Sequence, residues 1–217
     1  MRAGTGIERL LESRGKKYSE TLGIRLRTGK STETFKWFIA SILFGARIGE
    51  TVAIRTYRQF EKDGLLSFEK MSRASWDSLV ASLDAGGYVR YDFSTADDLI
   101  ACMKLLKERY DGDLDELHRQ AKDSRDLEAR LRGFRGVGPV TTNIFLRDLR
   151  GVWQKADPPL GHLAKKAARG LGISDAKEFW KKNKVRGYDF ANFETALMRL
   201  GRESRRRKVG AEKILEG

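Results

Sequence analysis

A glycine-rich turn between two predicted helices is the feature that most restricts how this chain folds. The stretch from Leu131 to Asn143 reads Leu-Arg-Gly-Phe-Arg-Gly-Val-Gly-Pro-Val-Thr-Thr-Asn. Gly136 and Gly138 lack a Cβ, so the backbone there can approach another group closely. Pro139 suits the first turn of a helix, because its missing N–H costs nothing at that position. We expect a helix, a hairpin and a second helix whose first N–H groups face an anion such as phosphate.

The turn alone is weak evidence of function, since many Gly-x-Gly turns are only tight connections. The chain adds 43 Lys and Arg against 30 Asp and Glu, a net charge of +13. This balance favours DNA, RNA or an anionic membrane surface as partner. No stretch approaches the roughly 20 apolar residues of a membrane span, and no secretory apolar core is present. We therefore expect a soluble intracellular protein, nucleoid-associated in the cytoplasm or nuclear, with no membrane partner.

Metal and disulfide chemistry have few residues to use. Cys102 is the single cysteine, which excludes intrachain disulfides and a cysteine-held iron–sulfur cluster. Its spacing with Leu99, Met103 and Leu106 predicts a thiol on the core side of a helix. The chain has 2 histidines, too few for the usual His-based zinc site. We expect no metal centre.

The periodicity of apolar residues predicts an all-α protein with no strand and no internal repeat. Only 3 prolines interrupt a chain rich in Leu, Ala, Lys, Arg and Glu. Residues 35–44 are apolar nearly all round and predict a buried central helix, whereas residues 1–30 are only weakly periodic. Further helices are predicted at residues 50–61, 76–84, 94–110, 114–117, 124–132, 139–149, 175–182 and 189–201, with another starting at Asp157-Pro158.

Three segments in this order resemble the helix-hairpin-helix DNA glycosylase superfamily that includes endonuclease III. Residues 37–47, Trp-Phe-Ile-Ala-Ser-Ile-Leu-Phe-Gly-Ala-Arg, resemble its buried early helix and the loop that follows. Residues 87–91, Gly-Tyr-Val-Arg-Tyr, with the next helix resemble the elements before its hairpin. Residues 134–143 resemble the family hairpin, hydrophobic-Pro-Gly-Val-Gly-x-Lys-Thr-Ala-Asn, and Ala156-Asp157 lies where the family has Val-Asp. The resemblance covers about two thirds of the chain.

The resemblance implies two helical domains with DNA lying in the cleft between them. A helical barrel over residues 33–147 would end in the hairpin. Residues 1–32 and 148–217 would form the second domain, which would carry Asp157. Double-stranded DNA is the implied partner, with one nucleotide flipped out because the glycosidic bond is inaccessible inside the stack. We expect a monomer.

The resemblance assigns catalysis to Asp157, whose carboxylate would support the positive charge on the sugar or orient the attacking water. Asp157 followed by Pro158 is also a frequent helix start with no catalytic role. The family's bifunctional members have a lysine nucleophile where this chain has Val140, and valine forms no Schiff base. A monofunctional glycosylase without AP-lyase activity is therefore expected. Family hairpins also hold a monovalent cation, which the resemblance implies here; no iron–sulfur cluster is expected.

The DNA contacts implied by the resemblance come from three places along the chain. The hairpin would anchor a phosphate. Arg47 and the loop at residues 88–91 would enter the duplex where the base has left, with Tyr88 as the favoured wedge. A basic helix after the catalytic residue would approach the backbone. The predicted DNA-binding residues are Gly136, Val137, Gly138, Val140, Thr141, Arg47, Tyr88, Arg90 and Lys165.

The sequence leaves more than one function open. Asp157-Pro-Pro159 replaces the family's Asp-Thr-His, a departure that also fits a non-catalytic protein binding damaged or distorted DNA. An RNA-binding module is less consistent, because few aromatic platforms for single-stranded RNA are visible. The base lesion does not follow from the sequence, because the shape of the pocket decides it.

Overall fold

The computed structural model describes residues 3–216, and the regular secondary structure of this part of the chain consists of helices joined by turns and loops. Its β-structure is limited to one isolated bridge, between Arg150 and Trp153. The all-α prediction is therefore confirmed. No helix within residues 3–216 is long and apolar enough to cross a membrane.

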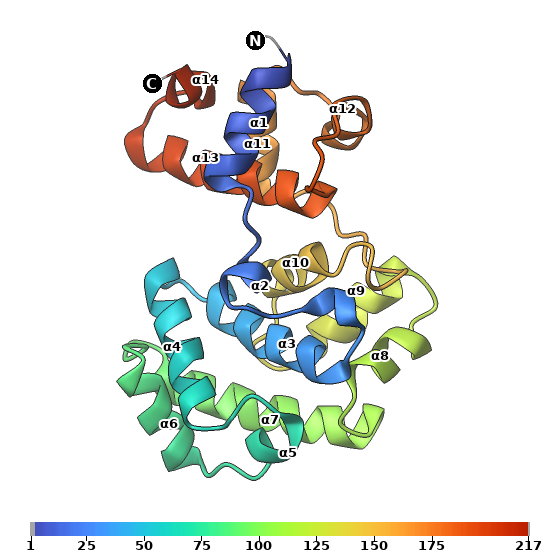
Figure 1. Cartoon of the computed structure of the whole chain (residues 1–217). Helices are drawn as coiled ribbons and strands as arrows, with labels where there is room; N and C mark the ends of the chain where they lie inside the picture. Colours follow the sequence, from blue (N-terminus) through green and yellow to red (C-terminus); the bar gives the residue numbers. More distant parts are fainter. Residues whose placement is uncertain (1–2, 217) are drawn as a thin grey trace. The chain divides into compact units, whose positions relative to one another are not determined.

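The chain divides into two compact units (Figure 1). The larger unit spans Leu22–Pro158, and the smaller unit combines the residues up to Thr21 with those from Pro159 onward. The boundaries expected after residues 32 and 147 lie instead after residues 21 and 158. Asp157 consequently belongs to the larger unit, with the hairpin, and its expected place in the domain of the termini is corrected.

The larger unit is built around one apolar helix. Trp37, Phe38 and Ile39 of this helix are completely buried, as the run of apolar residues predicts. The Trp37 indole Nε1 donates a hydrogen bond to the Phe145 carbonyl, at 2.9 Å, which ties the central helix to the helix after the hairpin. The elements are η1 (Leu26–Thr28), α3 (Ser31–Gly45), α4 (Glu50–Lys62), α5 (Phe68–Met71), α6 (Trp76–Ala85), α7 (Asp92–Tyr110), α8 (Leu114–Gln120), α9 (Ser124–Arg132) and α10 (Pro139–Asp148).

The smaller unit has a core of its own. Phe193 is fully buried and stacks on Trp180, with ring centroids 5.5 Å apart. The alanines of α11 pack against α13, and Gly201 lies so close to the Leu163 carbonyl that a Cβ would not fit. The elements are α1 (Ala3–Arg14), α2 (Tyr18–Thr21), α11 (His162–Gly170), α12 (Ala176–Lys182), α13 (Phe190–Arg207) and α14 (Ala211–Glu216).

Several helix ends differ from the prediction for local reasons. Helix α7 begins at Asp92 rather than Ser94, and the side chain of Asp123 caps α9 where Ser124 was expected. Helix α13 continues through the basic run to Arg207, and Glu203 pairs with Arg207 one turn along, at 2.8 Å. Helix α1 forms in a segment judged only weakly periodic, and it buries Ile7, Leu10 and Leu11.

Candidate functional site

The hairpin has the geometry that the glycine spacing predicts. Helix α9 ends at Arg132, and α10 begins with Pro139 as its first residue and Gly138 as its N-cap. Gly136 has φ = 75°, a left-handed conformation that favours glycine, and the Asp98 carboxylate fills the space a Cβ would need. A Cβ at Gly138 would meet open space. Gly136 is therefore required by the fold, whereas Gly138 leaves room for a ligand to approach the backbone.

Helix α7 holds the hairpin from behind. The Arg135 guanidinium pairs with Asp98 at 3.0 Å, and the Cys102 thiol donates to the Arg135 carbonyl at 3.2 Å. Burial, together with the nearby Asp98 carboxylate, raises the pKa of Cys102 to about 12. Cys102 is thus a buried neutral thiol, as predicted, and its role here is to fix the turn.

The predicted hairpin residues differ in exposure. Val140 is 61% exposed on the first turn of α10, whereas the side chains of Val137 and Thr141 are buried. Only the backbone of Val137 is therefore available to a partner. The Thr141 hydroxyl lies where a Cβ of Gly45 would be, so the end of α3 meets the start of α10. The structure thereby brings the exposed Arg47, two residues after Gly45, close to the hairpin.

The loop between α6 and α7 differs from the prediction in which of its side chains are exposed. Arg55 donates from Nε to the Gly86 carbonyl at 2.6 Å and fixes the start of the loop. Tyr88 is only 1% exposed, and burial raises its pKa to about 12, so the expectation that it enters the duplex is wrong. Val89 is 66% exposed instead, and Arg90 beside it is exposed with its guanidinium over the Tyr91 ring. The sequence prediction favoured Tyr88 and did not single out Val89, the exposed apolar residue of this loop.

The segment after α10 is anchored on α8 by aromatic and polar contacts. The Trp153 Nε1 donates to Asp115 at 2.8 Å, and the His118 ring stacks on Trp153 with centroids 4.8 Å apart. Lys155 donates from Nζ to the His118 carbonyl at 2.8 Å, which satisfies one carbonyl at the end of α8. Burial, and then the charge of Lys155, lowers the pKa of His118. The segment that carries Asp157 is therefore held in one position.

Asp157 lies at the exposed end of this segment. Its side chain is 53% exposed and forms an ion pair with Arg150, whose second Nη also donates to the Pro158 carbonyl. The expected helix start at Asp157 is wrong, because α11 begins at His162 with Gly161 as N-cap. A residue that precedes proline is disfavoured in the helical region, and Asp157 and Pro158 both precede one.

The hairpin and Asp157 lie beyond opposite ends of one helix. Helix α10 has 10 residues, with the hairpin before Pro139 and Arg150 two residues after its last residue, Asp148. A helix of this length is about 15 Å long. One strand of duplex DNA rises about 3.4 Å per phosphate, so this length matches a few nucleotides of backbone.

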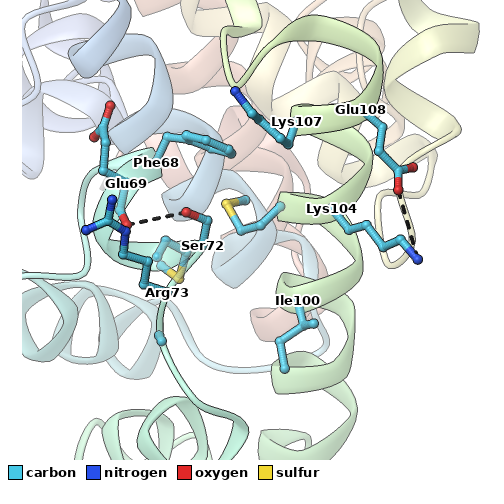
Figure 2. A pocket seen from close by; sticks show the side chains of 11 residues that line it. Phe68, Glu69, Ser72, Arg73, Ile100, Lys104, Lys107 and Glu108 are labelled. Atoms are coloured by element: carbon cyan, nitrogen blue, oxygen red, sulfur yellow. Dashed lines mark hydrogen bonds and ion pairs between the residues drawn. The ribbon is translucent and has the colours of Figure 1, made fainter.

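A groove in the larger unit contains none of the predicted site residues. Figure 2 shows Phe68, Ser72 and Arg73 from α5 and the following turn facing Ile100 and Lys104 on α7. Its volume is about 590 Å³. Its lysines are engaged in ion pairs, Lys104 with Glu108 at 4.0 Å and Lys107 with Asp111 at 2.6 Å.

The two units differ in charge. The smaller unit has 20 Lys and Arg against 10 Asp and Glu, and the larger unit has 23 against 20. Lys165 lies on α11, where Lys166 and Arg169 are also exposed and no acidic residue is present. Lys165, which we predict to contact the DNA backbone, thus lies on a strongly basic helix of the smaller unit.

Comparison with known proteins identifies the fold. No protein-family model matches the sequence, and no curated protein matches it. The structure is similar to the crystal structure of the H. pylori 3-methyladenine DNA glycosylase MagIII bound to 1,N6-ethenoadenine, with a TM-score of 0.55. The match covers 94% of this chain and 98% of that chain, at 12% sequence identity. The chain therefore has the fold of a DNA glycosylase over nearly its whole length, which confirms the fold implied by the hairpin resemblance.

Proposed function

We propose that this protein is a monofunctional DNA glycosylase, which hydrolyses the bond between the deoxyribose and a damaged or mispaired base flipped out of the duplex. The observation that carries the proposal is the placement of Asp157. A half-exposed carboxylate is fixed beyond one end of α10, and a hairpin suited to phosphate lies at the other end. This arrangement occurs in a chain with a glycosylase fold.

Asp157 supplies a negative charge beside the sugar, where positive charge develops during the reaction. As the C1′–N bond breaks, its electron pair leaves with the base and positive charge develops on the sugar. A carboxylate beside this centre stabilises the transition state, as in sugar hydrolysis generally. Water then adds to C1′ and loses a proton. Val140 provides no amine, so no Schiff base forms and the strand stays intact.

The hairpin and the exposed loops bind the DNA in this proposal. The backbone around Gly138 approaches a phosphate without steric hindrance, at the N-terminal end of α10. Arg47 and Arg90 are exposed cations on the loops of the same unit. Val89 takes the place proposed for Tyr88, since small apolar side chains also insert between base steps.

The substrate class is proposed from the chemistry of the similar enzyme. MagIII is a 3-methyladenine DNA glycosylase, and its structure holds 1,N6-ethenoadenine. Both are modified adenines. Duplexes carrying a modified purine are therefore the first substrates to test, with uracil, mispaired thymine and oxidised purines completing the panel.

The test uses end-labelled duplexes with one modified base each. Wild-type protein should yield strand breaks only after hot alkali, because the abasic site survives without lyase chemistry. Asp157→Asn should bind the same duplexes and release no base. The matched control is Asp77→Asn, which removes an exposed carboxylate on α6 and should leave the rate unchanged.

One observation favours a second function. The Arg150 ion pair neutralises Asp157, as expected if the carboxylate served only to hold the segment in a non-catalytic protein that binds damaged DNA. Tight, lesion-selective binding with no base release from any duplex would establish that function. Strand cleavage without alkali would contradict the monofunctional mechanism.

A further inference from the structure

The Asp157 carboxylate does not lie at a helix N-cap, since Gly161 is the N-cap of α11. Aspartate at a helix N-cap is usually fixed by the N–H groups two and three residues further on. Here the residue two positions further on is Pro159, which has no N–H, and the next helix begins only at His162. Asp157 therefore lies outside the usual N-cap arrangement, and a side-chain donor contributes to holding its carboxylate.

Arg150 supplies such donors from the start of the same segment. One Nη of its guanidinium pairs with the Asp157 carboxylate, and the other donates to the Pro158 carbonyl. Only 10% of the Arg150 side chain is exposed, so its position is set by packing. A backbone bridge joins Arg150 to Trp153, whose indole is fixed by Asp115.

We propose that Arg150 is a positioning residue for catalysis, which holds the Asp157 carboxylate in place in a segment where Pro158 and Pro159 supply no N–H donor. The inference rests on the proposed glycosylase function. The fork of the guanidinium is essential to it, because two groups four bonds apart in the backbone must be held at once. A lysine ammonium provides the charge but lacks this planar geometry.

The variants separate positioning from simple folding. Arg150→Met should fold, because Asp157 is half-exposed and its charge is not stranded in the interior. Its rate of base release under excess enzyme should fall roughly 10- to 100-fold, the cost of a misplaced catalytic group. Its Kd for lesion-containing duplex should stay within about twofold, since the interaction acts in the transition state.

Recovery of the base-release rate distinguishes a positioning role of Arg150 from a purely structural one. Arg150→Lys should recover part of the rate, and guanidinium ion at millimolar concentration should accelerate Arg150→Ala but not the wild type. Arg58→Met, which removes an exposed ion pair with Glu61 on α4, is the control and should keep the full rate. A full rate in Arg150→Met, equal rates in all Arg150 variants with no rescue, or a loss confined to Kd would overturn the proposal.

An activity-independent measurement distinguishes this inference from the proposed function. Arginine-selective ¹⁵N–¹H NMR of the full chain should resolve separate Arg150 Nη signals. The two contacts of the Arg150 guanidinium, with the Asp157 carboxylate and the Pro158 carbonyl, form a clamp that slows guanidinium rotation. Asp157→Asn should collapse the separate signals. If the wild type releases no base but these signals behave as expected, the function fails while the clamp stands. If the signals are averaged in the wild type, the clamp itself is refuted.

Discussion

The two units of this protein differ in their charge balance and in the candidate site residues that they contain. The larger unit is close to neutral, with 23 basic against 20 acidic residues, and it contains the hairpin and Asp157. The smaller unit has twice as many basic as acidic residues, 20 against 10, in a shorter stretch of chain. Long-range attraction to a polyanion depends on net charge, whereas positioning a carboxylate depends on individual contacts. Substitutions in the two units should therefore change different quantities.

The largest effect on stability is expected at the hairpin of the larger unit. Gly136→Ala puts a Cβ at φ = 75° and against the Asp98 carboxylate. Left-handed backbone and steric overlap together should cost about 2–4 kcal/mol of unfolding free energy, measured by urea denaturation. Gly138→Ala meets open space and should cost less than about 1 kcal/mol while weakening DNA binding. Equal losses of stability would show that the hairpin is not held by α7 as described.

The next effect concerns the charge of the smaller unit. Replacing Lys165, Lys166 and Arg169 by glutamine should weaken DNA binding about tenfold and reduce the slope of log Kd against log salt by roughly 2 to 3. The rate of base release by enzyme-saturated DNA should not change. Fluorescence anisotropy at several salt concentrations measures both affinity and slope.

A control in the larger unit removes the same number of charges. Its substitutions are Arg58→Gln, Lys104→Gln and Lys107→Gln, on side chains that already form ion pairs. The salt slope should then stay close to that of the wild type. If both triple variants lose affinity equally, net charge alone governs binding and the distinction between the units fails.

The smallest effect is a pH dependence at His118. Its pKa is lowered below 6.5 in the folded protein by burial and by Lys155. Between the lowered pKa and 6.5 the unfolded chain binds more protons, so stability falls as the pH falls through this window. His118→Phe keeps a ring on Trp153 and should remove this slope, a difference that solvent screening keeps below about 1 kcal/mol. Urea denaturation near pH 7.5 and near pH 5 tests it; an unchanged slope would count against the His118–Lys155 contact.

Local rules in the sequence predicted the hairpin and the central helix well. Gly136 and Pro139 occupy the positions that their backbone preferences demand, and the apolar run of α3 is buried as expected. These features depend on neighbouring residues. The helix start predicted at Asp157-Pro158 was wrong for a local reason as well, because a proline disfavours the helical conformation of the residue before it.

Other parts of the site depend on tertiary contacts that no spacing reveals. The direction of Tyr88 is decided by its burial next to α7. Contacts from Trp153 and Lys155 to α8 place the segment after α10 in the larger unit. The clamp of Arg150 on Asp157 requires the turn at Gly151 to bring residues seven positions apart together. Such pairings follow from the folded path of the chain, and only the structure shows them.

The central proposal is that the Asp157 carboxylate assists the hydrolysis of the glycosidic bond of a flipped-out modified base by stabilising the charge that develops on the sugar. The most direct test is base release under excess enzyme from a duplex with one 1,N6-ethenoadenine, or the best substrate of the panel, by wild type and Asp157→Asn. The account predicts alkali-dependent breaks with the wild type, a rate lowered roughly 100- to 1,000-fold or more in the variant, and equal DNA affinity. Equal rates in the two proteins, or no base release from any duplex by the wild type, would contradict it.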